Sequence, residues 1–331
     1  MTGNDRSTTR PADEHANGDE HADGDSRSNG DQHADGDSRS NAAGLADDRT
    51  RPTDIAASDP TAKPSAIHGE TLRIGYPSTE EPVVTTERVD VPAGEVTALV
   101  GPNGSGKSTL LKALAKQLEP ESGSVLLDGR DVAEYGPKEF AREVGLLAQE
   151  NEAPGSTTVE ELVYHGRYPH RGFFEAVSTA DDEAVDRAID LAGVDHLRES
   201  PVSDLSGGQK QLVWIAMTLA QETDVLLLDE PTTYLDLRHQ LQVMEVIREL
   251  NAERGVTVAV VLHDLSQAAR FADNLIAMKD GGIYDWGPPR KVVTEALLED
   301  VFGVAATVDG DTPEGPTITP HRPVDRGDDE S

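Results

Sequence analysis

The sequence predicts an α/β fold with a mostly parallel core sheet. Short apolar segments with the length of buried strands alternate with helical segments after residue 96, and this alternation is typical of strand–helix–strand units. A glycine-rich loop at 101–109 stands between one such strand and a helix. We expect one ordered domain at 68–305, a disordered acidic tail at 1–67 and a frayed C-terminal extension at 306–331.

The expected elements follow one another in order along this domain. Two short strands, at 72–74 and 83–89, precede a buried strand at 96–100, a helix at 108–117 and a buried strand at 144–148. A mostly helical stretch at 159–192 has a polar break at 178–182 that offers helix caps, and a helix at 207–221 follows it. Strands at 225–228 and 257–261 then alternate with helices at 237–254 and 266–271.

The tail is a low-complexity segment rich in Asp, Gly, Ser, Asn and His, in which the segment 21–29 recurs as 33–41. It contains too little apolar surface to offset the chain entropy lost on folding. The chain has no cysteine, which excludes disulfides and thiolate metal sites. It also has no secretory signal and no apolar run near the roughly 18 residues of a spanning helix. We therefore expect a cytoplasmic chain, with membrane spans supplied by other chains if it serves a membrane process.

The formal net charge is −33, from 62 acidic and 29 basic residues. Phosphate backbones are bound by Lys and Arg, so this charge argues against nucleic acid as a partner. Acidic residues continue into the predicted domain, as at 181–183 and 298–300. This favours adaptation to high salt, because salt screens the repulsion between like charges. The alternative is an acidic tail attached to an ordinary domain.

The glycine-rich loop fits the pattern G-x-x-x-x-G-K-[ST] of a phosphate-binding loop. It consists of Gly101, Pro102, Asn103, Gly104, Ser105, Gly106, Lys107, Ser108 and Thr109. Its backbone N–H groups and the start of the next helix would face phosphate oxygens. Lys107 would reach the β- and γ-phosphates of ATP, and the Ser108 hydroxyl would bind Mg²⁺. The alternative is a glycine-rich turn with an exposed lysine.

Two acids end the apolar strand at 225–228, namely Asp229 and Glu230. The strand tip would carry Asp229 to the phosphate end of the sheet, where it can hold Mg²⁺. Glu230 is placed to polarise an attacking water as a general base. The alternative is a solvated strand end.

A third motif, Leu205-Ser206-Gly207-Gly208-Gln209, resembles the signature of ABC-type ATPases, and the order of motifs matches that family over 71–305. The resemblance implies a P-loop ATPase fold with a small N-terminal antiparallel β part and a helical signature subdomain at about 150–210. It implies that Glu230, His263 and Lys107 are catalytic and that Ser108, Gln149 and Asp229 bind Mg²⁺. Tyr76 would stack on adenine, Asp236 would belong to the D-loop and His263 would contact the γ-phosphate.

The same resemblance implies a head-to-tail homodimer. Gly207 and Gly208 open a helix, so its free N–H groups and Ser206 form a second anion site. In the family, ATP lies between Lys107 of one subunit and Ser206 of the other.

The segments 157–170, 232–240, 263–268 and 287–289 resemble importer ATPases for ferric siderophores, haem and cobalamin. This implies membrane-spanning permease subunits that dock after Gln149, an external binding protein that acts indirectly, and a place at the cytoplasmic face of the membrane. Tyr168, Phe173 and Phe174 would be aromatic anchors for the permease or would pack inside the helical part.

Three alternatives are an exporter ATPase, a soluble ABC protein of repair or translation, and a nucleotide-binding regulator. No fused membrane domain is visible, 150–204 is too short for a long coiled coil, and only one phosphate-binding loop is present. Glu230 and His263 together argue against the regulator.

Overall fold

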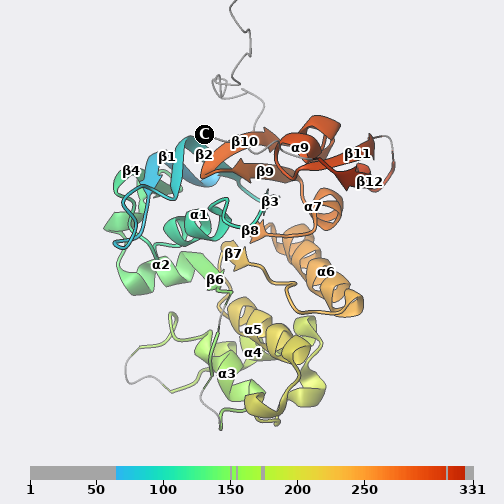
Figure 1. Cartoon of the computed structure of the whole chain (residues 1–331). Helices are drawn as coiled ribbons and strands as arrows, with labels where there is room; N and C mark the ends of the chain where they lie inside the picture. Colours follow the sequence, from blue (N-terminus) through green and yellow to red (C-terminus); the bar gives the residue numbers. More distant parts are fainter. Residues whose placement is uncertain (1–64, 150, 154–155, 173–175, 311, 325–331) are drawn as a thin grey trace, which may run out of the picture. The chain divides into compact units, whose positions relative to one another are not determined.

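A six-stranded sheet forms the centre of the domain, in the order β10-β9-β3-β8-β7-β6 (Figure 1). Its strands are β3 (Val96–Val100), β6 (Val144–Leu147), β7 (Val225–Asp229), β8 (Thr257–Val261), β9 (Asn274–Lys279) and β10 (Gly282–Gly287). All neighbours are parallel except β10, which runs antiparallel to β9. The expected mostly parallel α/β sheet is therefore confirmed. The structure, a computed structural model, describes residues 65–149, 151–153, 156–172, 176–310 and 312–324, so most of the tail that was expected to be disordered lies outside the described residues.

Both faces of this sheet are covered, which explains its continuous apolar strands. Every residue of β3, β7 and β8 is buried. Along β7 the side chains alternate, so that Leu226 and Leu228 join one apolar cluster while Val225 and Leu227 join the other. The first cluster contains α5 (Gly207–Ala220), α6 (Leu237–Arg254) and α7 (Leu265–Phe271), and the second contains α1 (Lys107–Leu114).

A second sheet, of antiparallel strands in the order β2-β1-β4-β5, packs on the side of α1. It consists of β1 (Ser65–Ile74), β2 (Val84–Pro92), β4 (Ser122–Leu127) and β5 (Arg130–Asp131). The expected antiparallel part is present, but β1 begins at Ser65 rather than at Leu72. Because β1 pairs with both β2 and β4, even weak strand formers such as Gly69 and Glu70 are held in the ladder.

The helical part contains α3 (Val159–His165), α4 (Thr179–Ala192) and α5, which lie side by side in Figure 1. The polar break expected before α4 is its cap, because Ser178 accepts from the Asp181 N–H while the Asp181 side chain accepts from the Ser178 N–H. The same reciprocal cap begins α3 at Thr158 and α5 at Ser206. Short helices outside this part are α2 (Pro137–Glu143), α8 (Pro289–Val292) and α9 (Glu295–Asp300), with a 3₁₀ turn at Val132–Glu134. Two further 3₁₀ turns, at Asp195–Leu197 and Val202–Asp204, lie between α4 and α5.

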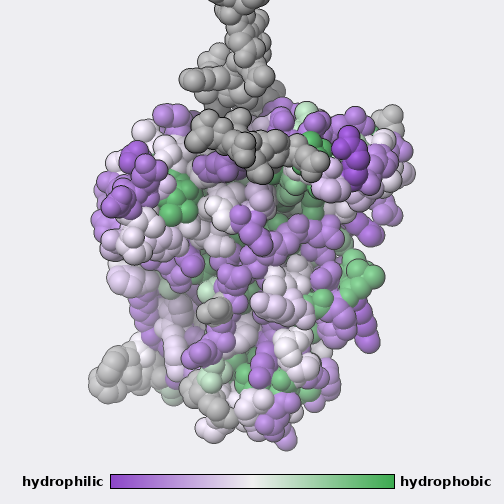
Figure 2. All heavy atoms as spheres, in the orientation of Figure 1, coloured by the Kyte–Doolittle hydropathy of each residue, from purple (hydrophilic) through white to green (hydrophobic). Residues whose placement is uncertain are grey.

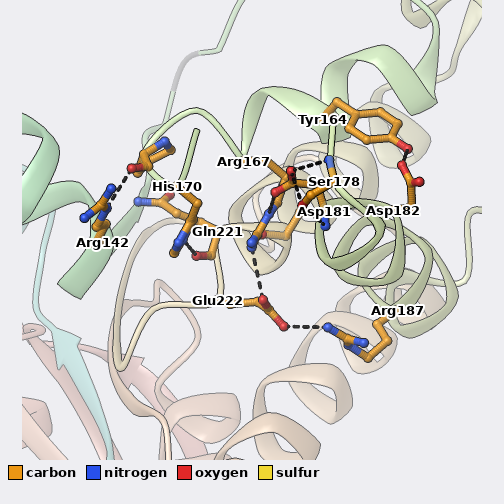
Figure 3. A network of polar contacts seen from close by, with 12 residues as sticks. Arg142, Tyr164, Arg167, His170, Ser178, Asp181, Asp182, Arg187, Gln221 and Glu222 are labelled. Carbon is orange, nitrogen blue, oxygen red and sulfur yellow. Dashed lines mark hydrogen bonds and ion pairs between the residues drawn. The ribbon is translucent and has the colours of Figure 1, made fainter. Parts of the chain in front are cut away.

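The side chain of Arg167 joins three helices of this part (Figure 3). Arg167 follows α3, is 5% exposed, and donates from Nε to Asp181 Oδ1 of α4 at 3.0 Å. Its Nη1 donates to the Ala220 carbonyl at the end of α5 at 2.6 Å and to Glu222 Oε2 at 3.1 Å. The guanidinium is thus satisfied by ionic and carbonyl partners, as a buried charge requires.

The segment after Arg167 also bonds to the sheet side of the domain. Arg142 of α2 donates to the Pro169 carbonyl at 2.7 Å, and His170 Nε2 lies 2.7 Å from the Gln221 carbonyl. Gln221 in turn donates to the Val144 carbonyl at the start of β6 at 3.1 Å. These contacts tie the helical part to α2 and β6, and Figure 3 shows those of Arg142 and His170.

The C-terminal part differs from the frayed extension expected from residue 306. Strand β11 (Val304–Asp309) pairs antiparallel with β12 (Thr317–Pro323). Ala306 is buried, and Val308 and Ile318 pack against the core cluster. A few apolar side chains therefore anchor a segment whose polar and proline-rich composition suggested fraying. Within the described ranges, no helix combines the length and apolar character needed to cross a membrane.

Candidate active site

A pocket of about 420 Å³ lies at the carboxyl ends of the parallel strands, where α/β sheets bind their ligands. It brings the glycine-rich loop together with residues that follow three other strands. The predicted site residues that line it are Asn103, Gly104, Gly106, Lys107, Ser108, Thr109, Gln149, Glu230 and His263. Val83, Thr233 and Tyr234 also line it.

The loop needs glycine at two positions for reasons of space and backbone geometry. Gly101 has φ +151°, and a Cβ there would lie 2.3 Å from the Met278 carbonyl oxygen of β9. Gly106 has φ +96°, and a Cβ there would lie 2.5 Å from Val84 of β2. The backbone therefore curls closely against both sheets before α1 begins at Lys107, which leaves the first N–H groups of α1 available to an anion.

Lys107 is 5% exposed, and its Nζ donates to the carbonyls of Gly101 and Pro102, both at 2.9 Å. Burial lowers the pKa of Lys107, and the carboxylates of Glu230 and Asp229 partly oppose that shift. The ammonium is held at the mouth of the loop, where it can reach a phosphate oxygen with its remaining donor.

Asp229 and Ser108 meet beneath the loop, with the Ser108 hydroxyl donating to Asp229 Oδ1 at 2.7 Å. Asp229 is 2% exposed, and its Oδ2 has no hydrogen-bond partner among the described residues. Burial raises the pKa of Asp229, although the Ser108 hydrogen bond acts in the opposite direction. A hydroxyl oxygen beside an unsatisfied buried carboxylate oxygen is a suitable donor set for Mg²⁺, so these residues fit the ion.

Glu230 is held by three side chains, which come from the segments after β6, β7 and β8. Gln149 Nε2 donates to its Oε2 at 2.9 Å, the Thr233 hydroxyl donates to the same oxygen at 3.1 Å, and His263 Nε2 lies 2.7 Å from Oε1. The Glu230 side chain is 9% exposed, and its backbone is left-handed with φ +54°. Such a conformation is uncommon in non-glycine residues and often occurs at functional sites.

Thr233 is the residue of this cluster that was not predicted from the sequence. It lies in the turn after β7, three residues beyond Glu230. In a tight turn, a hydroxyl three residues after a carboxylate can hydrogen-bond back to it. This spacing is the sequence signal that could have identified Thr233.

The remaining predicted residues lie outside the pocket lining. Tyr76 is half-buried after β1, with its hydroxyl 3.3 Å from Thr109 Oγ1 of the loop. Asp236 caps α6 and accepts from the His239 N–H at 2.9 Å. The signature residues Leu205, Ser206, Gly207, Gly208 and Gln209 lie at the start of α5. Ser206 and Gly207 are exposed, and added side-chain volume at Gly207 would meet no atom within 4 Å.

In this site, a glycine-rich loop joins a buried strand to a helix, and the acid at the tip of a second strand bonds to the loop serine. These features define a P-loop ATPase of the α/β class. The chain also matches the family described as ABC transporter over residues 85–233. It is 47% identical to the ferric enterobactin transport ATP-binding protein FepC of Escherichia coli (strain K12) over 255 residues, which are 77% of this chain and 93% of that protein. It is 42% identical to the hemin import ATP-binding protein HmuV of Rhodopseudomonas palustris over 250 residues, with coverages of 72% and 90%.

Among solved structures, the ATP-binding cassette MJ0796 in a dimeric post-hydrolysis state with ADP and Pi is similar, with a TM-score of 0.60 and 28% identity. The similarity covers 67% of this chain and 98% of that chain. The chain therefore belongs to the ABC transporter family, as an ATP-binding subunit with ATPase activity.

Proposed function

We propose that this ATPase drives the import of a metal chelate of the ferric siderophore, haem or cobalamin type. The observation that carries the proposal is the 47% identity to a ferric enterobactin transport subunit over 93% of its length. The similarity to a hemin import subunit supports the same class of cargo. Segments 157–170 and 232–240, which suggested this group from the sequence, lie within the domain that carries the site.

For hydrolysis, the loop N–H groups and Lys107 bind the triphosphate, while Ser108 and Asp229 would hold Mg²⁺, with Gln149 as a further ligand. The bound ion would neutralise charge on the phosphates. Glu230 accepts a proton from the attacking water, and His263, 2.7 Å from Glu230, orients the carboxylate and reaches the γ-phosphate. Tyr76 stacks on the adenine. Catalysis then depends mainly on positioning and charge stabilisation.

A second copy of the chain completes the site. The exposed start of α5 supplies Ser206 and the N–H groups of Gly207 and Gly208, which lie outside the pocket of their own subunit. Asp236 lies near the same interface. The dimeric state of the similar cassette MJ0796 supports this arrangement. The two subunits face one another head to tail, with two ATP molecules between them.

Permease subunits bind the helical part and hold the ATPase at the cytoplasmic face of the membrane. Tyr168 is 59% exposed and stacks on His165 with ring centroids 4.9 Å apart. This supports Tyr168 as a contact for the permease, whereas Phe173 and Phe174 lie outside the described residues. A binding protein on the other side of the membrane acts through the permease.

The catalytic assignment predicts different behaviour for two variants. Glu230→Gln keeps the size of the side chain but removes its basicity, so ATP binds, the dimer accumulates and turnover falls by at least about 10²- to 10⁴-fold. Lys107→Ala removes a charge that holds phosphate, so ATP binding weakens and no ATP-dependent dimer forms. Size-exclusion chromatography with Mg²⁺ and ATP, together with phosphate release, measures both effects. A Glu230→Gln chain with the parent rate would show that another group acts on the water, and His263 would be tested next.

Cargo is tested in proteoliposomes that contain the ATPase, its permease and its binding protein. We expect a ferric siderophore, haem or cobalamin bound to the binding protein to be taken up and to stimulate phosphate release. Transport of none of the three would contradict the proposed import function while leaving the ATPase assignment intact.

A further inference from the structure

The turn that follows β7 brings the side chains of Thr233 and Glu230 into contact in the pocket. The Thr233 N–H donates to the Glu230 carbonyl at 3.2 Å, and the Thr233 hydroxyl donates to Glu230 Oε2 at 3.1 Å. The backbone bond fixes the distance between the two residues, and the hydroxyl bond fixes the direction of the carboxylate. Thr233 and Glu230 both line the pocket.

The three donors to Glu230 are not equivalent. Gln149 follows β6 and His263 follows β8, so their contacts join separate strands. Under the proposed function, both of these side chains also interact with Mg²⁺ or the γ-phosphate. Thr233 lies on the same turn as Glu230, so its contact does not depend on the position of a neighbouring strand.

We propose that Thr233 is a positioning residue for hydrolysis. Its hydroxyl holds Oε2 of Glu230, so that Oε1 faces His263 and the water that attacks the γ-phosphate. Without this bond, the Glu230 side chain rotates more freely, and fewer molecules hold the base in the productive orientation. The inference rests on the proposed role of Glu230 as general base.

The test compares full-length variants that keep or remove the hydroxyl. Thr233→Val keeps the branched shape and the backbone N–H, and we expect kcat to fall by about 10- to 100-fold with KM for ATP unchanged. Thr233→Ser retains a hydroxyl and should recover most of the parent kcat. In a Glu230→Gln background, Thr233→Val should cause little further loss, because the group that it positions has already been removed.

The neighbouring Thr232 provides a matched control. Its hydroxyl donates to Gln267 Oε1 at 3.3 Å, so Thr232→Val removes a hydroxyl from the same turn without touching Glu230, and kcat should stay near that of the parent. Parent-like kcat in Thr233→Val, an equally slow Thr233→Ser, or a loss explained by raised KM and a lower melting temperature would each overturn the inference. Parent-like turnover of Glu230→Gln would overturn the proposed base and this inference together, whereas a slow Glu230→Gln with a fast Thr233→Val overturns this inference alone.

Discussion

Asp229 carries a charge that its surroundings do not fully balance. The carboxylate is buried, one oxygen is bonded to Ser108 and the other has no partner among the described residues. Burial raises the pKa of this carboxyl above its ordinary value of 3.8. The folded state then binds its proton more tightly than the unfolded state, so the contribution of Asp229 to stability falls as pH rises from 3.8 through the raised value.

Replacing this charge should separate stability from activity. Asp229→Asn retains an oxygen for the Ser108 hydroxyl but removes the charge, so the protein without nucleotide or Mg²⁺ should gain roughly 1–3 kcal/mol at neutral pH. Turnover should be lost, because a neutral amide binds Mg²⁺ weakly. Thermal melting with and without Mg²⁺ and ATP measures the effect. A variant less stable than the parent in metal-free buffer would show that the buried charge is compensated.

At the scale of elements, the ends of α3, α4 and α5 meet at Arg167 (Figure 3). Helix propensity does not determine how three helices pack against one another, because that depends on tertiary contacts. The hydrogen bonds of Arg167 fix the relative positions of these three helices. The same guanidinium contacts Glu222, which also pairs with Arg187 at 2.8 Å. Glu222 therefore forms one ion pair with the buried Arg167 and another with the exposed Arg187.

This shared carboxylate allows a controlled comparison. Arg167→Met leaves Asp181 and Glu222 without their buried cation and should destabilise the domain by about 3–5 kcal/mol. Arg187→Met removes a partner whose side chain is 53% exposed, and should cost about 0–1 kcal/mol. Urea unfolding at fixed salt gives both values. Equal losses for the two variants would contradict a special role for Arg167.

The same network predicts an acid-sensitive step in stability. Burial alone would raise the pKa of Asp181, but hydrogen bonds from the Ser178 N–H and hydroxyl and from Arg167 outweigh it and lower the pKa to about 2. A lowered pKa means that the carboxylate stabilises the fold above the ordinary value of 3.8, and that this contribution is lost as pH falls toward about 2. The difference in unfolding free energy between the parent and Asp181→Asn should therefore shrink over this range. A difference that stays constant would exclude linkage through Asp181.

At the scale of the whole molecule, the dominant property is the net charge of −33. Hydrophilic residues cover most of the face seen in Figure 2, and acids in the described domain, such as Asp182 and Glu183 of α4, are exposed. Like charges at this density repel one another most when the solution contains little salt.

We expect the stability and the ATPase rate of the chain to rise from dilute buffer to molar KCl. The Debye length falls from about 10 Å at 0.1 M to about 3 Å at 1 M, which screens the self-repulsion. Deleting residues 1–64 is the control, because it distinguishes an acidic domain from an acidic tail. The shortened chain should keep its ATPase activity and the same salt dependence. Full stability and highest activity at 0.1 M salt would contradict the expected adaptation to high salt.

Local sequence determines much of the site. Gly101 and Gly106 mark a loop in which other residues would clash, and the apolar run before Asp229 marks a buried strand that ends in an acid. The polar break at Ser178 marks a helix cap. These features depend on backbone conformation and burial within a few residues, so sequence patterns report them directly.

Tertiary structure alone decided the remaining features. The first strand extends back to Ser65 because two other strands pair with it, and the pairing of β11 with β12 gives order to a segment that its composition suggested was frayed. Arg167 reaches Glu222, and Gln149 and His263 converge on Glu230, through bonds that hold only when the chain is folded. Strand pairing and charge compensation between residues far apart in the chain leave no local sequence pattern, because the partner of each polar group is chosen by packing.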